Sequence, residues 1–549
     1  MSSNSRRNSK ETLKHLAQYF EECTGLTAVH GVQYIGDRKR TWFERLIWAV
    51  IVTTSVSVCT KFVLQTYHKW QNAPVYVTIG TALVPIHDIA FPAITICPET
   101  KSNSSVYYYP DWIGRAFDKD VEISRVDRLK FEYISMICNR TYASSNFTQQ
   151  KFDADIHNFL YNITPRFEDT FTNCQFANLV ENCSEIFTPI FTREGVCYTF
   201  NALDRSKLFQ KDVYQFSDFH QLRKKMISPY PRRAVSSGVT GGLQVELRAF
   251  VKDMDYRCAT ALQGFKIIVH DSSELPTQTH NYLRVPLNQA VFAALSPEVI
   301  STKKNLESYS ADLRQCYFDE EKDLSHFRYY SRSNCEVECL GYLMENILGC
   351  LDFYLPRANI STPICGATQL EHIRMIERIL ATYISNTTSL NSRLEELLLK
   401  LIFDVAQSEE LVEKSATICN CLPSCSSVEY SFETTQSDYY WYYFEGHKEY
   451  KDREYRSLIN IHFKDAYYIP MQREEMFNIH FKAYAYYIPM QREEMFGSMD
   501  FIAYTGGLLG LFIGFSFISL AEIIYFLTLR IVCNAKLFGR KMWYGNPNC

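Results

Sequence analysis

The 549-residue chain lacks several features that mark common classes of protein. Its formal net charge is −4, so bulk charge gives no reason to expect a nucleic-acid partner. Residues 1–14 are polar and basic, without the apolar run and cleavage site of a secretory signal, so we expect no cleaved leader. We find no nucleophile–base constellation, phosphate-binding loop or metal-ligand spacing. We therefore expect neither an enzyme nor a cofactor or metal site.

Two long apolar stretches stand out instead. The first carries the charge of Lys61, close enough to one end for its ammonium group to reach lipid headgroups. The second carries only Glu522. Each has the roughly 20 residues needed to cross a bilayer core of about 30 Å, so we predict transmembrane helices at 46–66 and 499–529. The alternative is a buried helix of a soluble protein, which suits the Ser/Thr-containing first stretch better than the second.

Basic residues near the two stretches predict the topology. Lys and Arg favour the cytoplasmic flank of a transmembrane helix. They precede the first stretch and follow the second, so we expect residues 1–45 and 530–549 to be cytoplasmic and 67–498 to lie outside the plasma membrane. The basic residues are Arg38, Lys39, Arg40, Arg45, Arg530, Lys536, Arg540 and Lys541.

Cysteines and glycosylation sequons agree with this orientation. Of the 18 cysteines, 14 lie between the stretches, an even number that suits full pairing in an oxidising compartment. They are Cys97, Cys138, Cys174, Cys183, Cys197, Cys258, Cys316, Cys335, Cys339, Cys350, Cys365, Cys419, Cys421 and Cys425. Seven Asn-x-Ser/Thr sequons fall in the same region, at Asn103, Asn139, Asn146, Asn162, Asn182, Asn359 and Asn386.

The region between the stretches has a mixed α and β pattern. Leu and Ile at helical spacing predict amphipathic helices at 371–383 and 390–414, whose apolar stripes we expect to pack into a core. The aromatic run 438–450 lacks basic neighbours, so we interpret it as a strand rather than a stacking platform. Short runs rich in β-branched residues predict strands at 75–79, 94–97, 264–270 and 282–285.

Three cysteines, Cys419, Cys421 and Cys425, lie close together in the sequence and could hold zinc or form disulfides. A tetrahedral zinc site would need a second cysteine cluster or a histidine pair at a suitable spacing, and we find neither. The pattern therefore favours disulfides.

Several stretches together resemble the degenerin/epithelial sodium channel family, most closely its insect pickpocket members. They are FPAITIC at 91–97, His30-Gly31, CYTFN at 197–201 and GGLLGLFIGFS at 506–516, followed by Glu522. The motif in the second apolar stretch is the most specific of these. The resemblance covers residues 25–530.

The resemblance implies a membrane α fold with an α+β ectodomain, in which two transmembrane helices flank a disulfide-rich domain with a β-sheet palm and a helical thumb. The thumb is expected at about 316–425. It further implies a homo- or heterotrimer of related subunits in a lipid membrane, and a passive, non-voltage-gated cation pore. Sodium ions would be the permeant partner, amiloride-type compounds the blockers, and His30-Gly31 a cytosolic gating motif.

The resemblance also implies how the cysteines pair. Cys138 and Cys258 remain after the other twelve are assigned and are paired with each other. The other implied pairs are Cys97 with Cys197, Cys174 with Cys183, Cys316 with Cys425, Cys335 with Cys421, Cys339 with Cys419, and Cys350 with Cys365.

The second stretch carries glycines at 506, 510 and 514, which would form one smooth helix face. Such a face favours close helix packing, and it also frees backbone carbonyls to turn toward ions. The resemblance assigns Gly514, Phe515 and Ser516 to the selectivity filter, an extended interruption of the helix. Well-known members often have a small middle residue where this chain has Phe515, whose side chain must point away from the axis for selectivity to survive.

Three further residues receive roles in the pore and gate. By resemblance, Ala503 occupies the degenerin position outside the gate, and Gly507 a position linked to amiloride block. Glu522 is the single acid of its stretch. Because an isolated carboxylate in hydrocarbon is costly, we expect it to line the pore or to hydrogen-bond a neighbouring subunit.

A near-perfect repeat precedes the second stretch. NIHFKDAYYIPMQREEMF at 460–477 is followed at once by NIHFKAYAYYIPMQREEMF at 478–496. Two copies are too few for a solenoid, which needs three or more. A recent duplication or a gene-model error explains them better. We expect one copy to form the strand that leads into the second stretch, and favour the second copy because it is contiguous with Gly497.

Two other functions remain open from the sequence. One is a two-span ligand-gated receptor of another family, such as the ATP-gated channels. The other is a non-conducting or regulatory subunit that needs partners, which Phe515 and the repeat keep in consideration.

Overall fold

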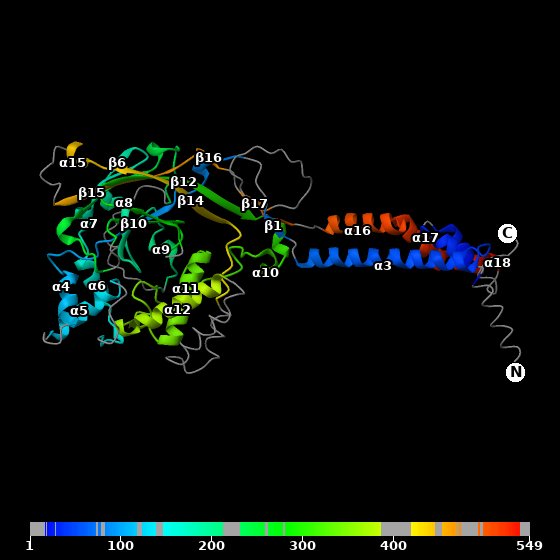
Figure 1. Cartoon of the computed structure of the whole chain (residues 1–549), viewed down its shortest axis with the longest axis horizontal. Coiled ribbons are helices and arrows are strands. Elements are labelled where there is room, and N and C mark those ends of the chain that lie inside the picture. The colour runs from blue at the N-terminus through cyan, green and yellow to red at the C-terminus, as the bar shows by residue number, and fades with distance from the viewer. Residues whose placement is uncertain are drawn as a thin grey trace. The chain divides into compact units, whose positions relative to one another are not determined.

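The computed structural model describes residues 17, 19–27, 29–72, 75–77, 83–117, 123–138, 147–211, 213, 231–258, 262–277, 280–302, 304–385, 419–444, 453–468, 471–473, 492–494 and 498–538. The chain divides into two units (Figure 1). The helical unit comprises Met1–Val77, Arg473–Ala485 and Arg492–Cys549, and the sheet unit comprises Thr78–Gln472 and Tyr486–Gln491. Each unit is described by itself.

The helical unit is built on two apolar segments that pack against each other. Helix α3 (Trp42–Asn72) has 31 residues, so it is about 46 Å long. Within it, 42–68 is long and apolar enough to cross a membrane, and most of its side chains are exposed in the single chain. Ring contacts pair Phe62 with Phe512 and Tyr67 with Phe501, so α3 and α16 (Ser498–Ile513) run antiparallel.

Short elements complete the helical unit. Strand β1 (Val75–Val77) follows α3, and β18 (Arg492–Glu494) precedes α16. The two strands pair antiparallel, with Val75 opposite Glu494, which joins the adjacent ends of the two apolar segments. The unit also contains α2 (Val32–Gly36), α17 (Phe517–Leu527), α18 (Leu529–Phe538) and the helical residues 19–26.

The larger sheet of the sheet unit has the order β14-β12-β15-β9-β5-β6, with β17 also paired to β12. Neighbouring strands are antiparallel except β12 and β15, which are parallel. The strands are β5 (Phe171–Phe176), β6 (Leu179–Glu181), β9 (Leu243–Phe250), β12 (Gln289–Thr302), β14 (Ser427–Asp438), β15 (Glu454–Phe463) and β17 (Met471–Arg473).

The second sheet has five strands in the order β11-β10-β3-β8-β7. They are β3 (Ala93–Pro98), β7 (Phe187–Thr192), β8 (Gly195–Phe200), β10 (Phe265–His270) and β11 (Tyr282–Val285). Two small pairs join β2 (Val84–Pro85) to β16 (Tyr467–Tyr468) and β4 (Lys151–Phe152) to β13 (Ile364–Cys365).

Helices flank the sheets in two groups. In Figure 1, α4, α5 and α6 gather in one group, and α11 and α12 pack against each other in another. The helices of the sheet unit are α4 (Tyr109–Phe117), α5 (Arg125–Ser135), α6 (Asp155–Ile163), α7 (Phe167–Thr170), α8 (Cys183–Ile186), α9 (Arg205–Leu208), α10 (Ala311–Arg314), α11 (Arg332–Leu348), α12 (Leu370–Ser385) and α15 (Trp441–Phe444).

The core is rich in aromatic rings. Phe91 is fully buried, and its ring meets those of Phe176, Phe200 and Phe463 at 5.4–6.2 Å between centroids. Edge-to-face pairs of this kind contribute about 0.5–1.5 kcal/mol each beyond the burial of area. Because Phe91 belongs to the FPAITIC stretch and Phe200 to CYTFN, these two stretches meet in the core.

The strands and the first amphipathic helix predicted from the sequence lie close to where they are observed. The strand predicted at 282–285 is β11, and those at 94–97 and 264–270 are β3 and β10 with small shifts at the ends. The strand predicted at 75–79 begins at β1, and 78–79 lie outside the described residues. The helix predicted at 371–383 is α12, whereas 390–414 lies outside the part of the chain that the structure describes.

The prediction of a strand at 438–450 was wrong for its described part. Strand β14 ends at Asp438, and residues 441–444 form the short helix α15. The turn buries Trp441 to 1% exposure, with the guanidinium of Arg456 4.5 Å from its ring centroid. Burial of this one ring outweighs the β propensity of the aromatic run.

The expectation that the second repeat copy forms the strand holds only next to the second apolar stretch, where Arg492–Glu494 form β18, whereas the long strand of the larger sheet ends in the first copy. Asn460–Phe463 of the first copy end β15, where Ile461 lies opposite Ala293 of β12 and Leu243 of β9. These residues continue the strand that begins at Glu454. The first copy therefore pairs with β9 and β12 because it directly follows residues 454–459 of that strand. Of the second copy, the described residues are Arg492–Glu494 in β18.

Candidate functional site

The second apolar segment is interrupted at the residues singled out from the sequence. Helix α16 ends at Ile513, and α17 begins at Phe517. Gly514 has φ +67°, a left-handed conformation that glycine adopts without the steric cost of a side chain and that commonly ends helices. The apolar segment therefore consists of shorter helices, and Phe501–Ile513 is below the length that would cross a membrane by itself.

Ser516 restarts the helix after this interruption. Its hydroxyl accepts a hydrogen bond from the Ser519 N–H at 3.3 Å, and the Ser519 hydroxyl accepts one from the Ser516 N–H at 3.1 Å. This reciprocal cap satisfies N–H groups that the first turn of α17 leaves without intrahelical partners. Residues 514–516 thus form a defined non-helical segment between two helices.

The His30-Gly31 pair lies against this interruption. The His30 N–H donates to the Ile513 carbonyl at 2.9 Å, which satisfies one of the last carbonyls of α16. A Cβ added to Gly514 would lie 2.6 Å from the His30 ring, so only glycine fits there. Gly31 also has a positive φ, +83°, and a Cβ there would lie 2.9 Å from a Val52 methyl of α3. The pair therefore links the end of α16 to α3.

The other predicted residues of α16 lie earlier in the helix, before the interruption. Ala503, Gly506, Gly507 and Gly510 are exposed in the single chain, and a Cβ added at any of the three glycines meets no atom within 4 Å. They leave an open small-residue surface on α16. Glu522 lies further along, in α17, and is half-buried, as is Phe515.

A contact that sequence reasoning missed lies at the C-terminal end of α17. The Tyr19 hydroxyl donates to the Phe526 carbonyl at 2.6 Å, and the Arg530 guanidinium pairs with Glu22 at 2.6 Å. Helical residues 19–26 therefore pack against α17 and α18. The sequence signal was weak, because the two partners of each contact lie more than 500 positions apart and carry no motif.

The structure joins the fourteen cysteines between the apolar segments in seven disulfides. They are the pairs expected from the resemblance, so Cys419, Cys421 and Cys425 are joined to other cysteines. The disulfides are Cys97–Cys197, Cys138–Cys258, Cys174–Cys183, Cys316–Cys425, Cys335–Cys421, Cys339–Cys419 and Cys350–Cys365.

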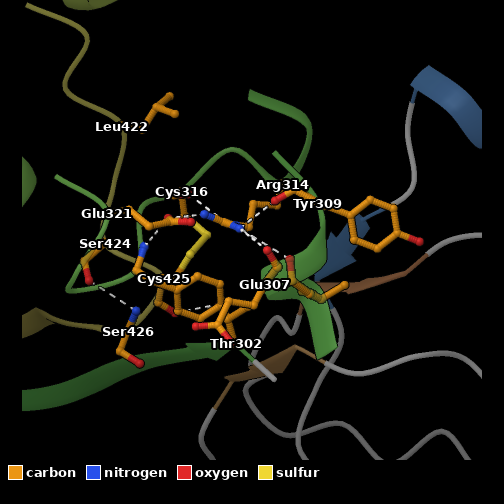
Figure 2. Close-up of a disulfide and its surroundings, with 12 residues drawn as sticks. Thr302, Glu307, Tyr309, Arg314, Cys316, Glu321, Leu422, Ser424, Cys425 and Ser426 are labelled. Atoms are coloured by element: carbon orange, nitrogen blue, oxygen red, sulfur yellow. Dashed lines mark hydrogen bonds and ion pairs between the residues drawn. A yellow bond between two sulfur atoms is a disulfide. The ribbon is translucent and has the colours of Figure 1, made fainter. Parts of the chain in front are cut away.

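One disulfide forms part of a polar cluster around the buried Arg314, near the end of β12 and the start of β14 (Figure 2). The Arg314 guanidinium lies beside the Cys316–Cys425 bond and donates to the Cys316 carbonyl at 3.1 Å and the Tyr309 carbonyl at 2.7 Å. It also pairs with Glu321. Thr302, the last residue of β12, donates through its hydroxyl to the Cys425 carbonyl at 2.7 Å. These contacts fasten the disulfide-linked region to the sheet.

Four of the seven sequons fall on described residues. Asn162, Asn182 and Asn359 are exposed, and Asn103 is half-buried with its side chain accepting from the Ser105 N–H at 2.9 Å. Asn139, Asn146 and Asn386 lie outside the described residues.

Comparison with known proteins identifies the class to which this arrangement belongs. A family model described as "Amiloride-sensitive sodium channel" matches residues 24–526. The chain belongs to this family of ion channels, the degenerin/epithelial sodium channel family. It is similar to Pickpocket protein 28 of Drosophila melanogaster, with 27% identity over 94% of this chain and 79% of that protein.

Two further relatives show how wide the similarity is. Sodium channel protein Nach of Drosophila melanogaster is 20% identical over 95% of this chain and 89% of its own length. The human bile acid-sensitive ion channel is 23% identical over 91% of this chain and 84% of its own length. The family match argues against the alternative of another two-span receptor family. The matched family consists of ion channels and not of enzymes.

Proposed function

We propose that this chain is a subunit of a trimeric, sodium-selective, amiloride-blocked channel in the plasma membrane, gated through its ectodomain and not by voltage. In this proposal α3 crosses the membrane once, and α16 and α17 together cross it a second time. Both termini are cytoplasmic, as the basic flanking residues favour. The larger sheet corresponds to the palm, and α11 and α12 to the thumb.

The interruption at Gly514–Ser516 is the observation that carries the proposal. Backbone that leaves the helix at membrane depth is tolerated only where it is buried in protein or lines water. Gly514 frees the chain to turn, and Ser516, which is exposed, caps the next helix. Three copies would place carbonyl and hydroxyl oxygens around a common axis, where they replace the hydration shell of sodium.

The remaining predicted residues take their roles from this geometry. Ala503, Gly507 and Gly510 are small residues of the open α16 surface, where three copies would approach each other at the gate. Glu522 would form an anionic ring on the cation pathway or a hydrogen bond to a neighbouring subunit. Once the gate opens, the membrane potential drives sodium inward with about 2.3 kcal/mol per charge per 100 mV.

The β1–β18 pair gives the gate a mechanical input. Each of its strands is next to one apolar segment, so a force on the pair acts on α3 and α16 at once. We expect conformational changes of the ectodomain to reach the gate through this pair.

The test is the current carried by Ala503→Val in voltage-clamped cells, because a bulky residue at the gate is expected to hold the pore open. We expect an inward sodium current that amiloride blocks and that wild-type and untransfected cells lack. Surface biotinylation controls for expression. Surface-expressed Ala503→Val without current, alone and with related subunits, would overturn the proposal.

A second candidate is a subunit that conducts only with related partners. Phe515 favours it, because a large side chain stands between Gly514 and Ser516 where three identical copies would converge. Current from Ala503→Val only after co-expression with a related subunit would select this candidate.

A further inference from the structure

A cavity in the sheet unit lies apart from the residues assigned to the pore. It has a volume of about 180 Å³ and opens between the five-stranded sheet and the α11–α12 pair. One wall is formed by β10 and the turn between β7 and β8, and the other by the two helices. A water molecule takes about 30 Å³ of liquid volume, so the space equals about six waters and suits a small organic molecule.

Most of the cavity wall is hydrocarbon. It includes Ile268 of β10, Val337 and Leu340 of α11 and Leu380 of α12, and each of these side chains is largely buried. Ala381, on the same helix as Leu380, also lines the cavity and is exposed. Pockets with mostly apolar walls and a few placed polar groups are the usual form of small-ligand sites.

The charged side chains of the wall are already held in ion pairs. The pairs are Lys266 with Glu194 at 2.8 Å, Arg193 with Glu377, and Glu336 with Arg332 at 2.9 Å. Lys101 and Arg332 do not line the cavity, but they add positive charge beside Glu194 and Glu336. A charged ligand would lose its hydration in the cavity without meeting an unpaired group of opposite charge. The cavity therefore favours an uncharged ligand.

One polar group of the wall is available to such a ligand. Tyr354 lines the cavity and is half-buried, and its hydroxyl makes no hydrogen bond within the part of the chain that the structure describes. Burial, helped by the nearby Asp352 and Glu377 carboxylates and opposed by Arg193, raises the pKa of Tyr354 well above its ordinary value. The hydroxyl therefore keeps its proton and can donate a hydrogen bond. Tyrosine hydroxyls in buried surroundings usually have a partner, and a ligand oxygen would supply one.

We propose that this cavity binds a compact, uncharged organic molecule that carries an acceptor oxygen on a hydrocarbon body, such as a short ketone, ester or alcohol. The Tyr354 hydroxyl donates to that oxygen, and the hydrocarbon lies against Ile268, Leu340 and Leu380. Bound there, the molecule bridges the sheet and the helix pair. An effect of such a ligand on current would rest on the proposed channel function, whereas its binding would not.

The test is isothermal titration calorimetry on the purified full-length chain in detergent. The probes are 2-hexanone, hexanoate and hexylammonium, which share a six-carbon body and differ in charge. Because the ketone also enters detergent micelles, its heats are compared with those of Ala381→Trp, which places a large side chain at the mouth from an exposed position. We expect saturable ketone binding that Ala381→Trp lacks, with the two ions at least about tenfold weaker.

Two further variants test the hydrogen bond. Tyr354→Phe removes only the hydroxyl and should weaken ketone binding by about two- to tenfold. Lys130→Met, on the exposed face of α5, should leave it unchanged. Thermal unfolding confirms that each variant is folded. Equal heats from the wild type and Ala381→Trp, tighter binding of either ion than of the ketone, or wild-type affinity in Tyr354→Phe would overturn the proposal.

Discussion

The His30 backbone N–H donates to the Ile513 carbonyl at 2.9 Å, at the point where α16 gives way to a non-helical segment. This bond brings a residue from before the first apolar segment to the middle of the second. It satisfies a carbonyl that the end of a helix otherwise leaves without a partner, which is costly away from water. The interruption at Gly514 is therefore held by a second part of the chain.

Gly514→Ala should disrupt this arrangement. Alanine at φ +67° costs about 1 kcal/mol or more, and its Cβ would lie 2.6 Å from the His30 ring. In the Ala503→Val background we expect most of the sodium current to be lost, measured against surface protein. Gly114→Ala is the matched control, since a Cβ there meets no atom within 4 Å.

Replacing the His30 ring separates the effect of the steric clash from the effect of the strained backbone at position 514. Adding His30→Ala to Gly514→Ala removes the clash and leaves the strained φ, so we expect partial recovery of current. A Gly514→Ala channel that conducts like its parent would show that the interruption is not part of the ion pathway.

Arg314→Met should destabilise the sheet unit strongly. The Arg314 side chain is fully buried, and its loss leaves carbonyls without a donor and Glu321 without this ion-pair partner. Each buried carbonyl left without a donor costs about 1–3 kcal/mol, while Glu321, whose side chain is 32% exposed, can turn to water. We expect a large fall in melting temperature and in surface expression. Arg332→Met, whose side chain is 46% exposed, should change stability by less than about 1 kcal/mol, and an equal loss in both variants would contradict this account.

Asp352→Asn should stabilise the protein at neutral pH. Burial, helped by the nearby Glu377 carboxylate and opposed by Arg193, raises the pKa of Asp352 to about 7. An unfolded aspartate titrates near 3.9, so between about pH 4 and pH 7 the folded state keeps a proton that the unfolded chain has lost. The free energy of unfolding therefore falls as pH rises through this range.

Asparagine can keep the hydrogen bond from the Phe353 N–H, 2.8 Å long in the wild type, and does not ionise. The melting temperature of Asp352→Asn should exceed that of the wild type at about pH 7.5, and the difference should shrink towards about pH 4.5. Asp319→Asn, at an exposed position, serves as control. A difference that is constant across pH would show that Asp352 does not titrate here.

The repeat allows a matched pair of deletions. Removing residues 474–492 joins Arg473 to Glu493 and leaves one copy with the spacing of the first. Removing 460–477 leaves one copy with the spacing of the second, which has one more residue between Phe481 and the Tyr-Tyr pair. A one-residue shift reverses which side chains face the core. We expect the first deletion to reach the cell surface normally and the second to disturb the pairing of β16 with β2.

Surface biotinylation and thermal unfolding compare the two deletions. Equal surface expression and equal thermal stability of the two deletions would show that the spacing between the end of β15 and the Tyr-Tyr pair does not affect folding. A peptide spanning Phe477-Asn478, sought by mass spectrometry of the wild-type protein, establishes whether both copies are expressed.

Features with local patterns could be predicted from the sequence. The first apolar helix, α12 and most of the strands were predicted from hydrophobic periodicity and composition. These signals depend only on residues close together in the sequence. The position of the interruption at 514–516 was expected from the family resemblance. The short helix at 441–444 was missed because burial of Trp441 against Arg456 depends on residues from another strand.

Long-range features needed the structure. Nothing near His30 indicates that its N–H meets Ile513, and nothing near Lys101 indicates that it shares Glu194 with Lys266. The choice between two almost identical repeat copies depends on pairing with β9 and β12. Contacts between residues far apart in the chain decide all three.

The most direct test of the central claim is the reversal potential of cells expressing Ala503→Val as external sodium is replaced by N-methyl-D-glucamine. A sodium-selective pore predicts a shift to more negative potentials, together with loss of the inward current. It also predicts that adding Gly514→Ala removes the sodium-dependent current while surface protein persists. A reversal potential that does not move with sodium would contradict the assignment of this chain as a sodium channel subunit.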